Sequence, residues 1–186
     1  MTITVKTCGD LLCRRGATFS KDLTHRYSLS LTWDSRLPVW VFIMLNPSTA
    51  DEMANDPTVT RCEKRARAGG AGCVIIVNLY SLRATDPAVL NTVPRAERIG
   101  GLENEDAIVE AVNRACLSSG RVVCAWGGSG PKDGRGKEVL RMLSDVSLWV
   151  LRLSQDGTPW HPLYVPNAET LKSWDVARQQ MIRESL

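Results

Sequence analysis

The sequence contains no apolar run long enough to cross a lipid bilayer. Its first residues are polar and lack the charged, apolar and small-residue regions of a secretory signal peptide. Neither a membrane span nor an export signal is therefore predicted. We expect a cytoplasmic protein without a membrane partner.

Several signatures of catalysis and metal binding are also missing. The glycine-rich stretch 127–130, followed by Lys132, lacks the G-x-x-x-x-G-K-[ST] spacing of a phosphate-binding loop. No G-x-S-x-G nucleophile elbow occurs. Cys8 and Cys13 do not form a C-x-x-C pair, and no second pair completes a zinc or iron–sulfur site. These absences disfavour nucleotide hydrolysis, serine-hydrolase chemistry and a cysteine-bound metal.

The composition is typical of one globular domain. The chain has 186 residues, of which 44% are hydrophobic and 23% charged, and its formal net charge is +3. This length suits a single α/β domain over residues 1–186. Cys73, Cys116 and Cys124 lie in or beside apolar segments, which favours reduced core thiols over disulfides.

Strand and helix patterns alternate after residue 38. Residues 1–24 show little periodicity and are expected to form an irregular or edge-strand lead-in. Residues 26–33 alternate as a half-buried strand with Arg26 on the polar side. Further strands are expected at 41–45, 73–77, 121–126 and 147–153, and helices at 57–68, 101–117, 136–143 and 168–183. This order predicts a three-layer α/β sandwich with a central, mostly parallel sheet flanked by helices.

Polar side chains follow the ends of the expected central strands. Asn46, Ser48 and Asp51 come after the apolar run 41–45, and Asn78 ends the next run. His161 follows the fourth strand. Ligands of open α/β sheets bind beyond the carboxyl ends of the strands, so we expect these side chains to converge on one site. An Asn side chain offers a donor and an acceptor together, which matches a nucleobase edge.

Most of these residues also have a purely structural interpretation. Asn46 precedes a proline and can bond the nearby backbone of a turn. Asn78 ends a buried strand and needs a partner from either the protein or a ligand. His161 can be an ordinary hydrogen-bonded loop residue. Asp51 can hold a water or orient Arg61, or it can simply be solvated.

Basic side chains gather in two places. One group crowds a predicted helix and the other crowds the glycine-rich loop: Arg61, Lys64, Arg65 and Arg67, and Lys132, Arg135 and Lys137. Each group alone fits a solvated surface. Beside a cleft, both groups become candidates for contacts with nucleic-acid phosphates.

Four motifs resemble those of the uracil-DNA glycosylase superfamily. Residues 45–48, Leu-Asn-Pro-Ser, resemble its first active-site motif in the Asn-Pro form of the mismatch-specific thymine/uracil branch. Residues 74–79 resemble the strand with the base-reading asparagine, 122–127 a later strand that ends in glycine, and 161–163 the closing His-Pro motif. Their order and approximate separations agree over most of residues 38–166.

The chain is also similar to DUF1643, a bacterial and phage family of uncharacterised proteins. The shared patterns are M-L-N-P-S-T-A-D, N-L-(F/Y)-x-L-R-A-T, A-W-G and H-P-L-Y. This second resemblance covers the same motifs more closely and implies no activity by itself.

The glycosylase resemblance implies a fold like that of uracil-DNA glycosylase and a specific reaction. The protein would hydrolyse the N-glycosidic bond of a flipped-out, modified pyrimidine base in DNA. The resemblance implies that Asn46, with Asp51, holds the attacking water and that His161 stabilises charge on the departing base. Asn78 would read the base edge. No metal or organic cofactor and no obligate protein partner is expected.

The same resemblance assigns further residues to binding. Ser48 would join the base pocket, and Tyr80 would either stack on the base or pack under its loop. The expected contacts with the DNA backbone are Arg61, Lys64, Arg65, Arg83, Lys132 and Arg135.

Two other functions fit the same pattern. One is an enzyme that binds a free nucleoside or nucleotide, either an N-glycosidase or a transferase, and the other is a non-catalytic DNA-binding module. Basic residues of the helix 57–68 at the mouth of the pocket would favour DNA, and their location on the far side would favour a small ligand.

Overall fold

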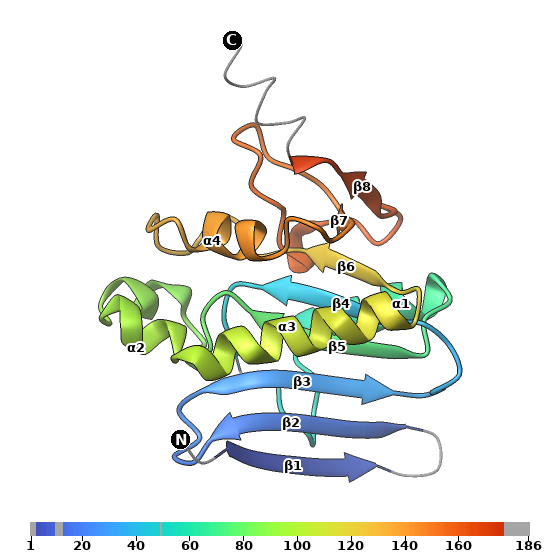
Figure 1. The fold of residues 1–186 in the computed structure, drawn as a ribbon, viewed down its shortest axis with the longest axis horizontal. Coiled ribbons are helices and arrows are strands. Elements are labelled where there is room, and N and C mark those ends of the chain that lie inside the picture. Colours follow the sequence, from blue (N-terminus) through green and yellow to red (C-terminus); the bar gives the residue numbers. More distant parts are fainter. Residues whose placement is uncertain (1–2, 10–12, 49, 177–186) are drawn as a thin grey trace.

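The structure, a computed structural model, describes residues 3–9, 13–48 and 50–176. Its central feature is an eight-stranded sheet with the order β1-β2-β3-β5-β4-β6-β7-β8 (Figure 1). The strands are β1 (Ile3–Gly9), β2 (Arg14–Ser20), β3 (Arg26–Thr32), β4 (Val39–Met44), β5 (Cys73–Asn78), β6 (Arg121–Cys124), β7 (Leu148–Val150) and β8 (Lys172–Trp174). The lead-in expected over residues 1–24 thus contains two strands, with β1 at the edge of the sheet.

The middle of the sheet is parallel and its edges are antiparallel. β4 pairs in parallel with β5 and β6, and β6 pairs in parallel with β7. The neighbours β1-β2, β2-β3, β3-β5 and β7-β8 are antiparallel. The prediction of a mostly parallel sheet was therefore wrong, and the sheet is mixed. The physical reason at the first edge is that the turns joining β1, β2 and β3 are too short for a crossover between parallel strands.

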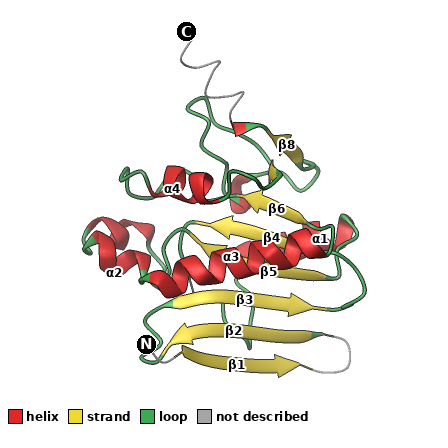
Figure 2. Cartoon of the chain, viewed as in Figure 1, coloured by secondary structure: helices red, strands yellow, loops and turns green. Residues whose placement is uncertain are grey.

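Helices cover both faces of this sheet (Figure 2). On one face lies α1 (Pro57–Ala68). Asp56 caps its N-terminus, because the Asp56 carboxylate accepts a hydrogen bond from the N–H of Val59. On the other face lie α3 (Leu102–Leu117) and α4 (Arg135–Met142), and α3 contacts β3, β4, β5 and β6. The predicted helices 57–68, 101–117 and 136–143 are thereby confirmed to within a residue at each end.

Two buried clusters lie on opposite faces of the sheet. The α1-side cluster contains Phe42, Val74 and Ile76, and the α3-side cluster contains Ile43 and Ile75. Successive strand residues point to opposite faces, so the continuous apolar runs of β4 and β5 supply both clusters. Burial of one such side chain contributes about 1.5–3 kcal/mol.

Some elements differ from the sequence-based expectation. Within the described chain, η1 (Pro87–Asn91) and α2 (Arg95–Ile99) lie between β5 and α3, and η2 (Pro162–Tyr164) follows His161. The helix predicted over 168–183 is wrong over residues 168–175, where β8 lies, whereas residue 176 is helical. Residues after 176 lie outside the described part.

The burial of one large aromatic side chain explains the last strand. Trp174 pairs with Leu148 of β7, and its ring lies 6.1 Å from the ring of Trp126. Burying a tryptophan outweighs a weak local preference for helix. Among the described residues, no helix combines the length and the apolar character needed to span a bilayer.

Candidate active site

The ends of β5, β4 and β6 lie side by side. Parallel pairing continues past the strands, because the N–H of Leu79 donates to the carbonyl of Met44 (2.8 Å) and the N–H of Ala125 donates to the carbonyl of Ile43 (2.8 Å). Asn46 therefore leaves the middle strand, with the end of β5 on one side and the end of β6 on the other. This is the edge at which ligands of α/β sheets bind.

Asn78 is the last residue of β5 and is 0% exposed. It pairs with Met44, and it lies on the α1 face because Val74 and Ile76, at even spacings before it, belong to the α1-side cluster. Both amide atoms are buried without a hydrogen-bond partner among the described residues. Leaving such a group unpaired costs about 1–3 kcal/mol, so this amide is a candidate for contact with a bound ligand.

The backbone beside Asn78 is held from the opposite face of the sheet. The Nδ2 of Asn104 on α3 donates to the carbonyls of Asn78 and Leu79, both at 3.2 Å. The Nε of Arg135, at the start of α4, donates to the carbonyl of Leu79 (3.1 Å). Asn78 therefore sits on a backbone that two helices fix in place.

Asn46 has one engaged end and one free end. Its Nδ2 donates to the carbonyls of Ala84 (2.8 Å) and Pro47 (3.1 Å). Because a carbonyl can only accept, these bonds determine which end of the amide is nitrogen. The remaining Oδ1 has no partner in the part of the chain that the structure describes. Asn46 thus bonds the backbone of the turn, as its structural interpretation predicts. The same two bonds orient its Oδ1, an acceptor that can hold a water.

His161 lies beside the end of β6. Gly127, which has a φ of +72°, packs closely against His161. If Gly127 had a Cβ atom, that atom would lie 3.0 Å from the Cβ of His161. The His161 Nδ1 is buried and has no partner among the described residues. Burial lowers the pKa of the imidazole below its usual range, against the opposing influence of the Asp56 charge. A neutral imidazole at pH 7 can donate one hydrogen bond to a developing anion.

Replacing His161 with glutamine is expected to make folding less sensitive to acid. The pKa is about 6.5 in the unfolded chain and lower in the folded protein, so the unfolded chain binds the proton first. The stability contribution is complete above about pH 6.5 and is lost as the pH falls through 6.5 toward the folded pKa. A difference of one pKa unit corresponds to about 1.4 kcal/mol.

Thermal unfolding from about pH 8 to about pH 5 measures this effect. The Tm of the wild type should fall more steeply than that of His161→Gln. His25, whose pKa is also lowered by burial, is present in both proteins and contributes equally. Parallel curves for the two proteins would contradict the prediction.

Asp51 and Ser48 lie in the segment between β4 and α1. The Asp51 carboxylate accepts hydrogen bonds from the N–H groups of Met53 (2.8 Å) and Ala54 (3.0 Å). Burial alone would raise the pKa of this carboxyl, but these bonds bring it below its usual range. Asp51 thus stabilises a local turn. The side chain of Ser48 is half-buried.

One family covers all of these residues. The family described as "Protein of unknown function (DUF1643)" matches residues 26–163 of the chain. The match runs from the first residue of β3 into η2. The chain belongs to the DUF1643 family. No curated protein and no solved structure matches it. β1, β2 and β8 lie outside the matched range.

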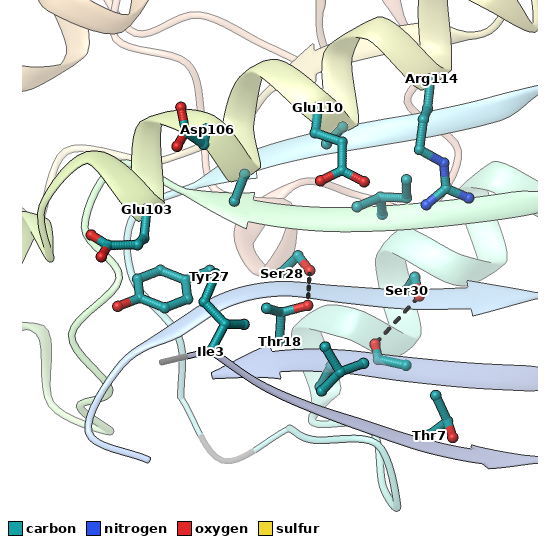
Figure 3. A pocket seen from close by; sticks show the side chains of 16 residues that line it. Ile3, Thr7, Thr18, Tyr27, Ser28, Ser30, Glu103, Asp106, Glu110 and Arg114 are labelled. Carbon is teal, nitrogen blue, oxygen red and sulfur yellow. Dashed lines mark hydrogen bonds between the residues drawn. The ribbon is translucent and has the colours of Figure 1, made fainter. Parts of the chain in front are cut away.

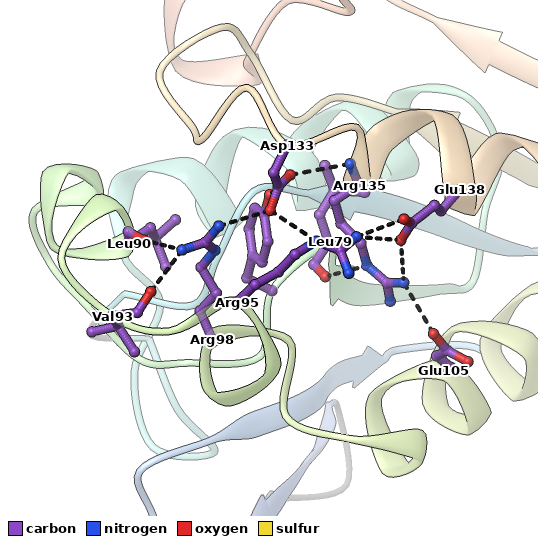
Figure 4. A network of polar contacts seen from close by, with 10 residues as sticks. Leu79, Leu90, Val93, Arg95, Arg98, Glu105, Asp133, Arg135 and Glu138 are labelled. Carbon is purple, nitrogen blue, oxygen red and sulfur yellow. Dashed lines mark hydrogen bonds and ion pairs between the residues drawn. The ribbon is translucent and has the colours of Figure 1, made fainter.

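In this DUF1643 domain, Tyr80 packs under its loop. The side chain is 1% exposed, and its hydroxyl donates to Asp133 (2.6 Å), which also accepts from Arg98 (2.8 Å; Figure 4). The Arg98 guanidinium lies 5.6 Å from the centre of the Tyr80 ring. Protein atoms therefore cover the Tyr80 ring. Of the two expected roles, this agrees with packing under the loop and not with stacking on a base.

The basic residues of α1 differ in their availability. Arg65 donates to four backbone carbonyls between residues 165 and 169, and Arg61 donates to the carbonyl of Val165 (3.3 Å). Lys64 is exposed and, with Arg61 and Asp56, lines a hollow of about 400 Å³. Arg61 and Lys64 thus border a cavity next to Asp56, whereas Arg65 mainly fixes the segment after η2.

The other basic candidates also bind the protein itself. Arg83 donates to the carbonyl of Leu23 (3.2 Å), and exposed Lys132 donates to the carbonyl of Gly128 (3.2 Å). Arg135 is 4% exposed and is paired with Glu105. Among the six residues expected to contact the DNA backbone, Lys64 and Lys132 are therefore the exposed ones.

Sequence reasoning missed Arg26, which is 1% exposed. Its guanidinium donates to the carbonyl of Ala50, and its Nε is buried with no partner among the described residues. The register shifts between Thr18 and Phe19, and Arg26 pairs with Phe19 of the α1-side cluster. This extra residue in β3 turns Arg26 away from the polar face that simple alternation predicts.

A second hollow lies away from the strand ends. It has a volume of about 300 Å³ between α3 and the strands β1–β3, and Tyr27, Ser28 and Ser30 line its floor (Figure 3). None of the predicted site residues lines it. Among the described residues, no group of three His, Cys, Asp or Glu side chains is placed to hold a metal ion.

Proposed function

We propose that this protein hydrolyses the N-glycosidic bond of a pyrimidine base extruded from DNA. The observation that carries the proposal is the buried Asn78 amide, whose donor and acceptor have no partner among the described residues. A pyrimidine edge presents a complementary donor and acceptor. The glycosylase-like order of the motifs adds support, together with the placement of Asn46 and Gly127 at adjoining strand ends.

The chemistry requires a held water and a stabilised leaving group. The free Oδ1 of Asn46 accepts a hydrogen bond from the water whose oxygen attacks C1′ of the sugar. The bond between C1′ and the base nitrogen breaks, its electron pair leaves with the base, and the proton of the water passes to solvent. Neutral His161 donates a hydrogen bond to the anionic base, which is an electrostatic stabilisation of the oxyanion type.

The buried state of Asn78 adds a condition. Because the amide is 0% exposed, a base reaches it only after the residues that cover it move. Extruding the nucleotide costs a further few kcal/mol of unstacking, roughly, and this cost is smallest for a mismatched or modified base.

A free nucleoside or nucleotide is the second candidate substrate. The observation in its favour is that Arg65 and Arg135 are engaged with protein atoms and are not offered to a DNA backbone. The reaction at the glycosidic bond would be the same. Lys64 and Arg61 favour DNA in turn, because they line the hollow at Asp56, whose charge acts on His161.

Base release from defined DNA tests the proposal. Duplexes with uracil, mismatched thymine or a hypermodified cytosine are incubated with the protein and assayed for abasic sites. Asn46→Ala is expected to slow release by about 100-fold, the lower range for losing one preorganised polar group at a reacting centre. Asn113→Ala, an exposed position on α3, serves as the matched control and should leave the rate unchanged.

Two results would contradict the proposal. One is the absence of base release from every duplex and every free nucleoside tested. The other is release by Asn46→Ala at the rate of the wild type.

A further inference from the structure

The guanidinium of Arg26 is buried without a carboxylate to neutralise it. The residue is 1% exposed, and among the described residues no Asp or Glu oxygen forms an ion pair with it. The guanidinium donates to the neutral carbonyl of Ala50, and its Nε has no acceptor among the described residues. An unpaired buried charge is among the most costly groups in a protein, so such a group is normally paired or bound to a ligand.

The two acidic side chains whose charges act on Arg26 form no ion pair with it. Asp51 and Asp56 act on Arg26 through their charges, but the Asp51 carboxylate binds the N–H groups of a turn and that of Asp56 caps α1. A second cation, Arg83, adds to the positive charge, since its guanidinium lies 5.3 Å from the ring centre of Phe19, the residue paired with Arg26. Burial lowers the pKa of Arg26 to about 10, so it remains charged at neutral pH.

Arg26 lies next to the candidate active site. β3 begins where β5 ends, and the N–H of Arg26 donates to the carbonyl of Ser81, three residues after Asn78 (2.9 Å). The Asp56 charge acts on both Arg26 and His161. The Arg26 Nε and the Asn78 amide, which both lack a partner in the described part of the chain, are therefore both buried where β3 meets β5.

From these contacts we infer that Arg26 binds a phosphate of the ligand whose base Asn78 reads. The inference rests on the proposed function in assigning the base to Asn78. A phosphate carries the negative charge and the several acceptor oxygens that a guanidinium fork matches. It would replace the carbonyl of Ala50 as the acceptor. The phosphate belongs either to a free nucleotide or to a DNA strand.

Calorimetric measurement of ligand binding to the intact protein tests the phosphate contact and distinguishes a free nucleotide from a DNA strand. The probes are thymidine and deoxycytidine, their 5′-monophosphates, inorganic phosphate, and a short single-stranded oligonucleotide without terminal phosphates. The wild type is expected to bind a monophosphate at least about 10-fold more tightly than the matching nucleoside, because a charge-assisted hydrogen bond is added. Arg26→Gln should reduce this ratio to about one. Arg36→Gln, at an exposed position, should leave it unchanged.

The comparison of nucleoside with nucleotide uses only the wild type, so it does not depend on the folding of a variant. Equal affinity for nucleosides, monophosphates and the oligonucleotide would overturn the inference, and so would a phosphate preference that survives in Arg26→Gln. Tight binding of the oligonucleotide alone, lost in Arg26→Gln, would support it and assign the phosphate to DNA.

The proposed function can fail separately. If Asn78→Leu retains Arg26-dependent binding of monophosphates and inorganic phosphate, the phosphate site stands and the base-reading role of Asn78 is wrong. If nucleotides bind as expected but no base is released from any substrate, the phosphate site again stands and the hydrolytic reaction is wrong.

Discussion

Replacing Asn78 with leucine is expected to stabilise the protein while abolishing binding of the base. Leucine has nearly the shape of asparagine, and the site is 0% exposed beside Met44 in the α1-side cluster. The substitution removes an amide whose two polar atoms lack partners among the described residues. The expected gain in the free energy of unfolding is about 1–3 kcal/mol, the usual cost of leaving such a group unpaired.

The same substitution at Asn104 is the matched control. Asn104 is also 0% exposed, but its Nδ2 donates to the carbonyls of Asn78 and Leu79. Asn104→Leu should therefore lower the free energy of unfolding by about 1–3 kcal/mol, because it removes a buried donor from both carbonyls and leaves that of Leu79 with the bond from Arg135. Urea unfolding at equilibrium measures both variants. A loss of stability in Asn78→Leu equal to that in Asn104→Leu would show that the protein itself satisfies the Asn78 amide.

Opposite signs at two buried asparagines would separate a functional group from a structural one. A destabilising polar group in a core is typical of functional sites, where its cost is offset elsewhere in the protein. At the end of β5 that offset comes from the surrounding apolar residues and from the bonds that Asn104 and Arg135 make to the backbone. Asn78→Leu would thus be more stable and inactive at once.

Local pattern was enough to predict the strand before Asn46, the strand that ends at Asn78 and the start of α1, but not η2 after His161. The apolar runs that form β4 and β5 end in polar residues, and Asp56 with Pro57 marks the start of α1. These signals depend on neighbours in the sequence, so they need no knowledge of the tertiary structure. The strand ends could be expected to meet because parallel strands end at one edge of a sheet.

Contacts between distant residues could not be predicted in this way. Arg65 was expected to face DNA, but it binds carbonyls about a hundred positions away, and Arg135 crosses to the carbonyl of Leu79. The burial of Arg26 depends on an irregularity in the pairing of β2 with β3, which alternation within one strand does not reveal. Trp174 forms a strand because β7 and Trp126 are there to receive it.

Replacing Asp133 with alanine is expected to be strongly destabilising. Asp133 accepts hydrogen bonds from Arg98 and Tyr80, and one of its oxygens lies 3.3 Å from the Nε of Arg95 (Figure 4). Burial opposes ionisation of this carboxyl, but the bonds from Arg98 and Tyr80 lower its pKa to about 2. Without it, the acceptors that the described residues leave to the Arg98 guanidinium are the neutral carbonyls of Leu90 and Val93.

The expected loss in the free energy of unfolding is about 3–5 kcal/mol, the range for removing one partner of a buried ion pair. Asp34→Ala is the matched control, because it breaks a pair with Arg36 whose side chain is 86% exposed, and little change in the urea midpoint is expected. A midpoint shift no larger in Asp133→Ala than in Asp34→Ala would contradict the prediction.

A double-mutant cycle extends the test to the candidate active site. Tyr80→Phe removes only the hydroxyl that donates to Asp133, so its effect should be much smaller in the background of Asp133→Ala than in the wild type. Tyr80 follows Asn78 by two residues, and Asp133 also accepts from the N–H of Arg135, which holds Leu79. Breaking this network should therefore loosen the end of β5. Asp133→Ala should weaken base binding even at temperatures where it remains folded, whereas Asp34→Ala should not.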